Sequence, residues 1–118
     1  MLNGSYSKPY PTVSCECIAA PAPYDQLLSV KELGMDMHYA EISLLTCAKC
    51  NRLWLRYHYE IEAFTASGRW YLGAITPEQA TLLTADNAKS TLEGLSWYYF
   101  GGSYFDGRIG RTSGTIWL

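Results

Sequence analysis

The cysteines of this chain stand in two close pairs, and thiols in that arrangement favour metal binding. One residue separates Cys15 from Cys17, and two residues separate Cys47 from Cys50. Two such pairs brought together in space form a tetrahedral cage of thiolates, and zinc is the ion that suits this cage. We therefore expect zinc as a cofactor, with metal ligands Cys15, Cys17, Cys47 and Cys50.

The second pair has the better spacing for a metal-binding turn. Two cysteines with two residues between them can both face one ion, and Asn51 tolerates the left-handed backbone that such a turn commonly needs. Lys49 offsets part of the negative charge of the thiolates. The first pair is tighter. An extended backbone would hold Cys15 and Cys17 apart along one face, so their shared role requires a local bend.

The two cysteine segments resemble the zinc-ribbon class, in which cysteine pairs on loops and hairpin turns share one zinc ion. The resemblance covers these segments and the hairpin expected around residues 47–50, and no other part of the chain. A shell of four thiolates is closed to water, which indicates a structural rather than a catalytic metal. Unrelated thiols, a redox dithiol and disulfides remain as alternatives.

Length and charge limit the classes of function. The chain has 118 residues and a formal net charge of -2, which predicts one domain over residues 1–118 and argues against nucleic acid as a partner. Residues 1–14 are expected to be flexible. The N-terminal residues lack the apolar stretch of a secretory signal, and no segment is long and apolar enough to span a membrane. We therefore expect a cytoplasmic protein, whose thiols stay reduced.

The elements that position the cysteines predict an α+β fold, with a mainly antiparallel sheet and short helices. The 10 Tyr, 4 Trp and 3 Phe favour pleated structure. Apolar and polar residues alternate over 39–46 and 53–64, and a third strand over 69–75 completes a meander whose first turn holds Cys47 and Cys50. Trp54 is the one apolar residue on the polar face of the second strand, whose other members are Arg56, His58, Glu60 and Glu62.

Three short helices are expected beside the sheet. The first covers residues 24–33 and stops at Gly34. The second covers 77–83 and begins with a capping box between Thr76 and Gln79, with Pro77 in the first helical position. The third covers 85–93, with Ala85, Ala88 and Leu92 facing inward.

Other candidate chemistry is weaker than the cysteine pattern. His58, Glu60 and Glu62 share a strand face and could perform acid–base chemistry, but any half-exposed strand produces the same alternation. His38 and His58 are the only histidines that could replace a cysteine ligand. No nucleophile elbow or phosphate-binding loop is present. We therefore assign no catalytic residue, and the balance is against an enzyme.

Aromatic residues gather near the C-terminal end and predict a hairpin over 96–105 with its turn at Gly101 and Gly102. Its rings are either core or an exposed surface, in which case they would bind a partner or a second copy of the chain. We expect a non-enzymatic, zinc-stabilised interaction module that binds a protein partner, in the manner of an inhibitor or immunity protein. The alternatives are a nucleic-acid-binding zinc ribbon and a small hydrolase or redox enzyme.

Overall fold

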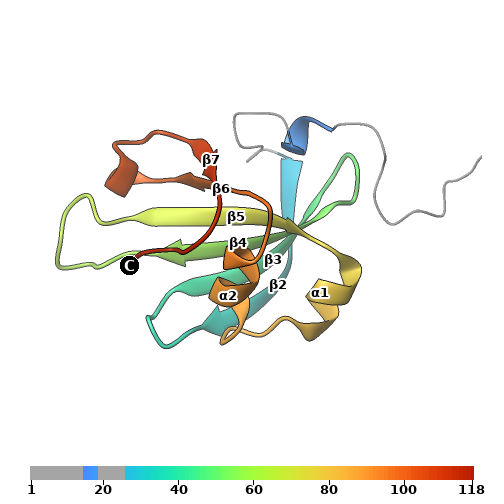
Figure 1. Ribbon diagram of the computed structural model, residues 1–118, viewed down its shortest axis with the longest axis horizontal. Coiled ribbons are helices and arrows are strands. Elements are labelled where there is room, and N and C mark those ends of the chain that lie inside the picture. The colour runs from blue at the N-terminus through green and yellow to red at the C-terminus, as the bar shows by residue number, and fades with distance from the viewer. Residues whose placement is uncertain (1–14, 19–25) are drawn as a thin grey trace, which may run out of the picture.

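The computed structural model describes residues 15–18 and 26–118 (Figure 1). Its elements, in chain order, are η1 (Glu16–Ile18), β2 (Leu27–Met35), β3 (Glu41–Cys47), β4 (Leu53–Tyr59), β5 (Arg69–Ile75), α1 (Pro77–Leu82), α2 (Ala88–Glu93), β6 (Tyr98–Gly101), η3 (Ser103–Phe105) and β7 (Gly110–Thr112). The predicted flexibility of residues 1–14 lies outside the described residues.

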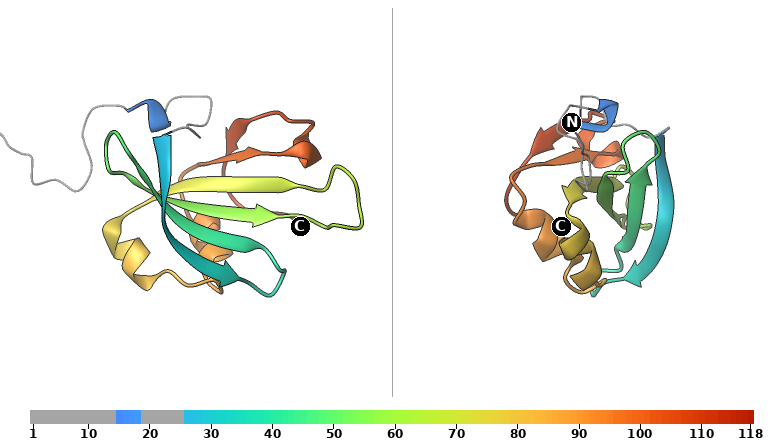
Figure 2. Two further views of the ribbon diagram at one scale, coloured as in Figure 1. Left: turned by 180° about the vertical axis from the view of Figure 1, so that it is seen from behind. Right: turned by 90° about the vertical axis from the view of Figure 1, so that its right-hand side faces the viewer.

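A single antiparallel sheet organises the described residues. Its six strands lie in chain order from β2 to β7, so that each strand pairs with its neighbours in sequence. The two helices come between β5 and β6 and lie on one side of the strongly twisted sheet (Figure 2). The sheet with its short helices confirms the expected α+β composition. No described helix is long and apolar enough to cross a membrane.

The two faces of the sheet bury two different sets of side chains. Because side chains alternate along a strand, Leu55 and Tyr57 of β4 pack toward α2, where they meet Ala88 and Leu92. Trp54, the apolar residue on the otherwise polar side of β4, is fully buried on the opposite face with Cys17, Cys47, Leu72 and Tyr99. The second face is therefore a core of its own, and it contains cysteines from both pairs.

Several predicted elements are confirmed with small changes of boundary. The strand predicted over 69–75 is β5, and the strands predicted over 39–46 and 53–64 are the shorter β3 and β4. At the start of α1, the Gln79 backbone N–H donates to the Thr76 hydroxyl, and the Thr76 N–H donates to the Gln79 side chain. The third predicted helix begins later, at Ala88, and buries Ala88 and Leu92 as expected.

The helix predicted over residues 24–33 is wrong. From Leu27 onward the chain forms β2, an edge strand that pairs with β3 from Leu27 opposite Cys47 to Met35 opposite Glu41. Pairing with a neighbouring strand outweighs the weak tendency of so short a segment to be helical. Gly34 does adopt a left-handed backbone, with φ of 92°, but at the second of two irregularities in this strand pairing rather than at a helix end.

The hairpin predicted over 96–105 is also wrong in its return strand. Gly101 ends β6, residues 103–105 form the short helix η3, and the chain comes back later as β7, where Gly110 lies opposite Phe100. After Gly102 the chain docks on the turn between β4 and β5, where the Tyr104 N–H donates to the Gly68 carbonyl at 2.8 Å. This contact directs the chain away from a two-residue turn.

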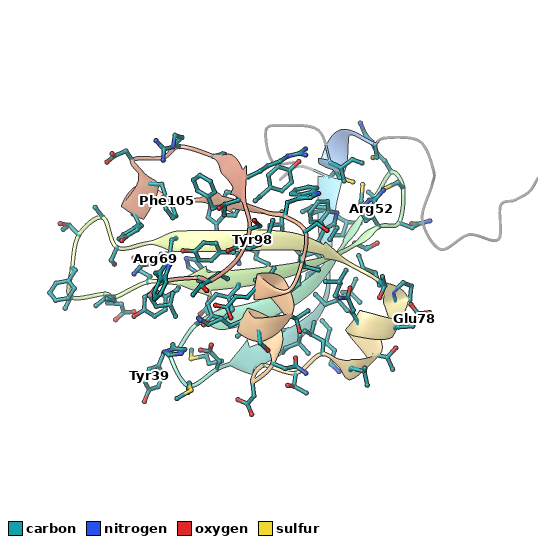
Figure 3. All side chains as sticks on the ribbon, viewed as in Figure 1. Tyr39, Arg52, Arg69, Glu78, Tyr98 and Phe105 are labelled. Atoms are coloured by element: carbon teal, nitrogen blue, oxygen red, sulfur yellow. The ribbon has the colours of Figure 1, made fainter. Side chains whose placement is uncertain are left out.

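The aromatic side chains of β6 are internal. Tyr98 packs on the helix side and Tyr99 on the opposite side, and the two rings are 1% and 0% exposed. The two side chains thus alternate between the two faces of the sheet, and Tyr98 is labelled in Figure 3. Of the two alternatives, core or exposed surface, the structure supports core for Tyr98 and Tyr99, while Tyr104 of η3 is 52% exposed. Self-association of the chain stays a prediction.

Candidate metal centre

The cysteines of both pairs meet at one end of the sheet. Their Sγ atoms all lie within 4.8 Å of one another, and they belong to Cys15, Cys17, Cys47 and Cys50. The Sγ atoms of Cys15 and Cys47 are 3.8 Å apart, and those of Cys17 and Cys50 are 3.5 Å apart. None of these four cysteines forms a disulfide bond. These separations are far longer than the roughly 2.05 Å of a disulfide bond.

The distances fit a tetrahedral metal site. With metal–sulfur bonds of about 2.3 Å, the corners of a tetrahedron lie about 3.8 Å apart. The two measured pairs fall at or just below this value. An all-sulfur donor set suits a soft or borderline ion such as zinc. The cluster can hold one metal ion without a large rearrangement of the chain.

The turn between β3 and β4 places Cys47 and Cys50. The Cys47 N–H donates to the Arg52 carbonyl at 2.9 Å, and the Asn51 N–H donates to the Cys47 carbonyl at 2.8 Å. Asn51 has φ of 65°, the left-handed backbone expected of it. These bonds close a tight loop, so that both thiols of the pair point to one side.

The first pair obtains its bend from η1. The Ile18 N–H donates to the Cys15 carbonyl at 3.0 Å, which closes a single turn of 3₁₀ helix around Cys17. A turn of this kind removes the extended geometry that would separate Cys15 from Cys17 along a strand. It is the local bend that the short spacing requires.

Gln26 adds polar contacts to the sulfur atoms. Its side-chain Nε2 donates to the Sγ atoms of Cys47 at 3.5 Å and of Cys15 at 3.8 Å. Its backbone carbonyl accepts a hydrogen bond from the Ala48 N–H at 2.7 Å. Donors to thiolate sulfur stabilise the charged form of the ligand. One residue, immediately before β2, therefore contacts both cysteine pairs.

Aromatic and basic side chains fix η1 on the sheet. The Tyr99 hydroxyl donates to the Cys17 carbonyl at 3.1 Å, and the Tyr99 ring stacks on Trp54 with centroids 5.7 Å apart. Arg111 of β7 donates to the Ile18 carbonyl, and its guanidinium lies 4.1 Å from the centre of the Trp97 ring. Residues distant in sequence thus position the first cysteine pair.

The environment shifts the acidity of the thiols in opposite directions. A hydrogen bond from the Cys17 backbone lowers the pKa of Cys15 to about 7 from the ordinary 9.0. Burial raises the pKa of Cys17 and of Cys50. Cys15 is therefore more easily deprotonated than Cys17 or Cys50. Because a metal binds thiolates, binding would release the protons of Cys17 and Cys50.

The other predicted candidates lie away from this cluster. His58 sits 3.6 Å from Glu41 and 3.8 Å from Glu60, atom to atom, and all three side chains are partly exposed. His38 is exposed in the turn between β2 and β3, next to Tyr39, which is labelled in Figure 3. Neither histidine belongs to the described cluster of possible metal ligands.

Sequence reasoning misses three residues that support the cluster. Gln26 stands in the segment where a helix is predicted, while Tyr99 and Arg111 reach the site only because β6 and β7 pair side by side. Nothing in the local sequence around Arg111 connects it with the cysteines. Comparison of the chain with family models, curated proteins and solved structures finds no match.

Proposed function

We propose that this protein is a zinc-stabilised, non-enzymatic interaction module that binds a protein partner. The four gathered thiols support the zinc. A closed thiolate shell would hold η1 against the sheet and leave no coordination position for a substrate or water. The metal would then stabilise the fold, and the surface of the protein would bind the partner.

The observation that supports a protein partner is the apolar surface of β2. Its Leu28, Val30 and Met35 side chains are 54%, 53% and 55% exposed, and Met37 in the next turn is 82% exposed. In the described part of the chain, β2 also ends the sheet, so its outer edge is open to pairing with another chain. An exposed apolar edge strand is a common site of strand addition by a partner.

The alternative of a nucleic-acid-binding zinc ribbon has less support. The chain has a formal net charge of -2. Two of its arginines are occupied by aromatic rings, since Arg69 lies over Tyr104 at 3.9 Å and Arg111 over Trp97 at 4.1 Å. A nucleic-acid surface requires basic side chains directed at phosphates.

Capture of a partner tests this function. We expect the tagged, zinc-loaded protein to retain a defined protein partner, and Val30→Asp to reduce its binding about tenfold or more, because a charge cannot be buried in an apolar contact. Phe64→Asp is the matched control, because Phe64 is 64% exposed in the turn between β4 and β5, away from β2. Equal effects of the two substitutions would argue against the β2 surface. Salt-sensitive binding of single-stranded RNA or DNA, with no protein retained, would support the alternative.

Metal analysis tests the cofactor separately. We expect protein purified under reducing conditions to contain about one zinc per chain, released by a thiol-modifying reagent. Elemental analysis before and after the reagent provides the measurement. A fully folded protein without metal would remove the central support for the proposal. Iron in place of zinc would instead indicate electron transfer.

A further inference from the structure

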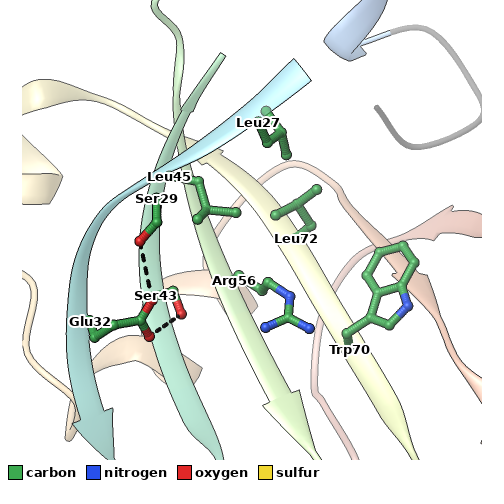
Figure 4. Close-up of a pocket in the computed structure, with 8 residues that line it drawn as sticks. All are labelled: Leu27, Ser29, Glu32, Ser43, Leu45, Arg56, Trp70 and Leu72. Carbon is green, nitrogen blue, oxygen red and sulfur yellow. Dashed lines mark hydrogen bonds between the residues drawn. The ribbon is translucent and has the colours of Figure 1, made fainter. Parts of the chain in front are cut away.

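A pocket of about 280 Å³ opens on the second face of the sheet, beyond the cysteines (Figure 4). Strands β2 to β5 provide its walls, so that it lies on the sheet rather than between the sheet and the helices. Eight residues line it: Leu27, Ser29, Glu32, Ser43, Leu45, Arg56, Trp70 and Leu72.

Arg56 provides the positive charge of the pocket. It projects from β4 between Ser43 on one neighbouring strand and Leu72 on the other, and Figure 4 shows its guanidinium directed into the open space. The side chain is half-buried. No described residue forms an ion pair or hydrogen bond with this guanidinium. A partly desolvated arginine without a counter-ion favours an anionic ligand.

The nearest acidic side chain is held by other groups. The Glu32 carboxylate accepts a hydrogen bond from Ser43 at 2.8 Å and from Ser29 at 3.1 Å (Figure 4). These hydroxyls fix Glu32 on the β2 side of the pocket, where it does not pair with Arg56. The charge of Arg56 therefore remains available to a ligand, while the fixed Glu32 charge repels anions that extend too far toward β2.

The rest of the pocket is apolar. Leu27, Leu45 and Leu72 cover the end nearest the cysteines, and the Trp70 indole forms the side wall. Trp70 is held close to β6: a Cβ atom at Gly101 would lie only 2.3 Å from Cζ2 of the indole. A ligand with a hydrocarbon part next to its charged group would bury that part here.

We propose that this pocket binds a small organic carboxylate with a short hydrocarbon body. The carboxylate meets the planar guanidinium of Arg56, which suits two parallel hydrogen bonds. The hydrocarbon body lies against Trp70 and the leucines. The size of the pocket is at the lower end for small-molecule sites, which fits a short acid better than a large cofactor. No cysteine of the metal cluster lines the pocket, so the proposed binding requires neither the metal nor the protein partner.

Titration with hexanoate tests the proposal. We expect the indole N–H signal of Trp70 to shift in a two-dimensional NMR spectrum as hexanoate is added to the zinc-loaded full chain. The indole of Trp117 is the internal control and should not move, because Trp117 is 79% exposed and lines a different pocket. Hexan-1-ol has the same hydrocarbon body without the charge, and its dissociation constant should be at least about tenfold higher than that of hexanoate. Equal binding of acid and alcohol, or an unmoved Trp70 signal at millimolar hexanoate, would overturn the proposal.

Two charge substitutions give changes of opposite sign. Arg56→Gln should raise the dissociation constant for hexanoate about tenfold or more, because it removes a charge-assisted hydrogen bond. Glu32→Gln should lower it about twofold, because it removes a nearby negative charge. Arg108→Gln, an exposed arginine outside the pocket, should leave it unchanged.

Folding is checked by thermal melting of each variant. If Arg56→Gln lowers the melting temperature markedly, Arg56→Lys is used in its place. Lysine keeps the positive charge but lacks the planar guanidinium, so hexanoate binding should fall less than expected for Arg56→Gln. Weaker hexanoate binding by Glu32→Gln would contradict the repulsion assigned to Glu32, and it would refute the assignment.

Discussion

Replacement of Cys47 by serine should lower the melting temperature by about 10 °C or more, which corresponds to roughly 3 kcal/mol for a domain of this size. Cys47 is fully buried beside Trp54 and Tyr99. Its substitution removes one thiolate from the cluster and leaves a polar hydroxyl among apolar side chains. Both changes weaken the attachment of η1 to the sheet.

Lys49→Ala is the matched control, because Lys49 is exposed in the same turn. It changes charge near the thiolates without removing a metal ligand, so its effect should stay within about 0.5 kcal/mol. A chelator should bring the melting temperature of the original protein and of Lys49→Ala down toward that of Cys47→Ser. Small and equal shifts for both variants, with no response to chelator, would show that the thiol cluster does not stabilise the fold through a metal.

Gly102→Ala should destabilise the protein by about 3 kcal/mol or more. Gly102 has φ of 114° and ψ of 174°, a backbone region almost restricted to glycine. A Cβ atom there would also lie 2.5 Å from the Gly68 carbonyl oxygen and 2.8 Å from the Arg69 Cα atom. Both neighbours are backbone atoms, so relief requires the turn after β6 to separate from the turn before β5.

Gly107→Ala separates the conformational cost of a positive φ from the cost of the steric clash. Gly107 also has a positive φ, of 78°, but an added Cβ atom meets nothing within 4 Å. Only the conformational cost remains, about 1 kcal/mol. Urea unfolding of both variants provides the comparison. If both lose the same free energy of unfolding, close packing of Gly102 against the β4–β5 turn contributes nothing.

The parts of the fold that the sequence predicts well are those with a regular local pattern. Residues 69–75 form β5 with the predicted bounds, and the Thr76–Gln79 capping box starts α1 where expected. The spacing of the two cysteine pairs correctly predicts that the four thiols lie together, because close pairs of cysteines commonly bind one metal ion. These signals reside in a few consecutive residues, and tertiary contacts do not override them.

The parts of the fold that the sequence predicts wrongly depend on contacts between residues far apart in the chain. β2 is an exposed edge strand whose pairing with β3 slips twice, so its side chains do not alternate as a regular strand requires. β7 consists of a glycine and two polar residues, Gly110, Arg111 and Thr112, and it is defined by its pairing with β6. Trp54 reads as an exception on a polar face because the residues that cover it, Cys17 and Tyr99, come from both ends of the chain.

The order of strands in the sheet has a consequence for the rates of folding and unfolding. Every pairing in the described sheet joins strands that follow one another in the chain, so few long loops must close before the strands meet, and this topology favours rapid folding. The link between Cys15 and Cys47 spans 32 positions and does not take part in any of these pairings. A metal ion joining them can therefore form its bonds after the sheet is in place, where it slows unfolding far more than it speeds folding. Zinc would then determine the rate of unfolding, and the order of the strands would determine the rate of folding.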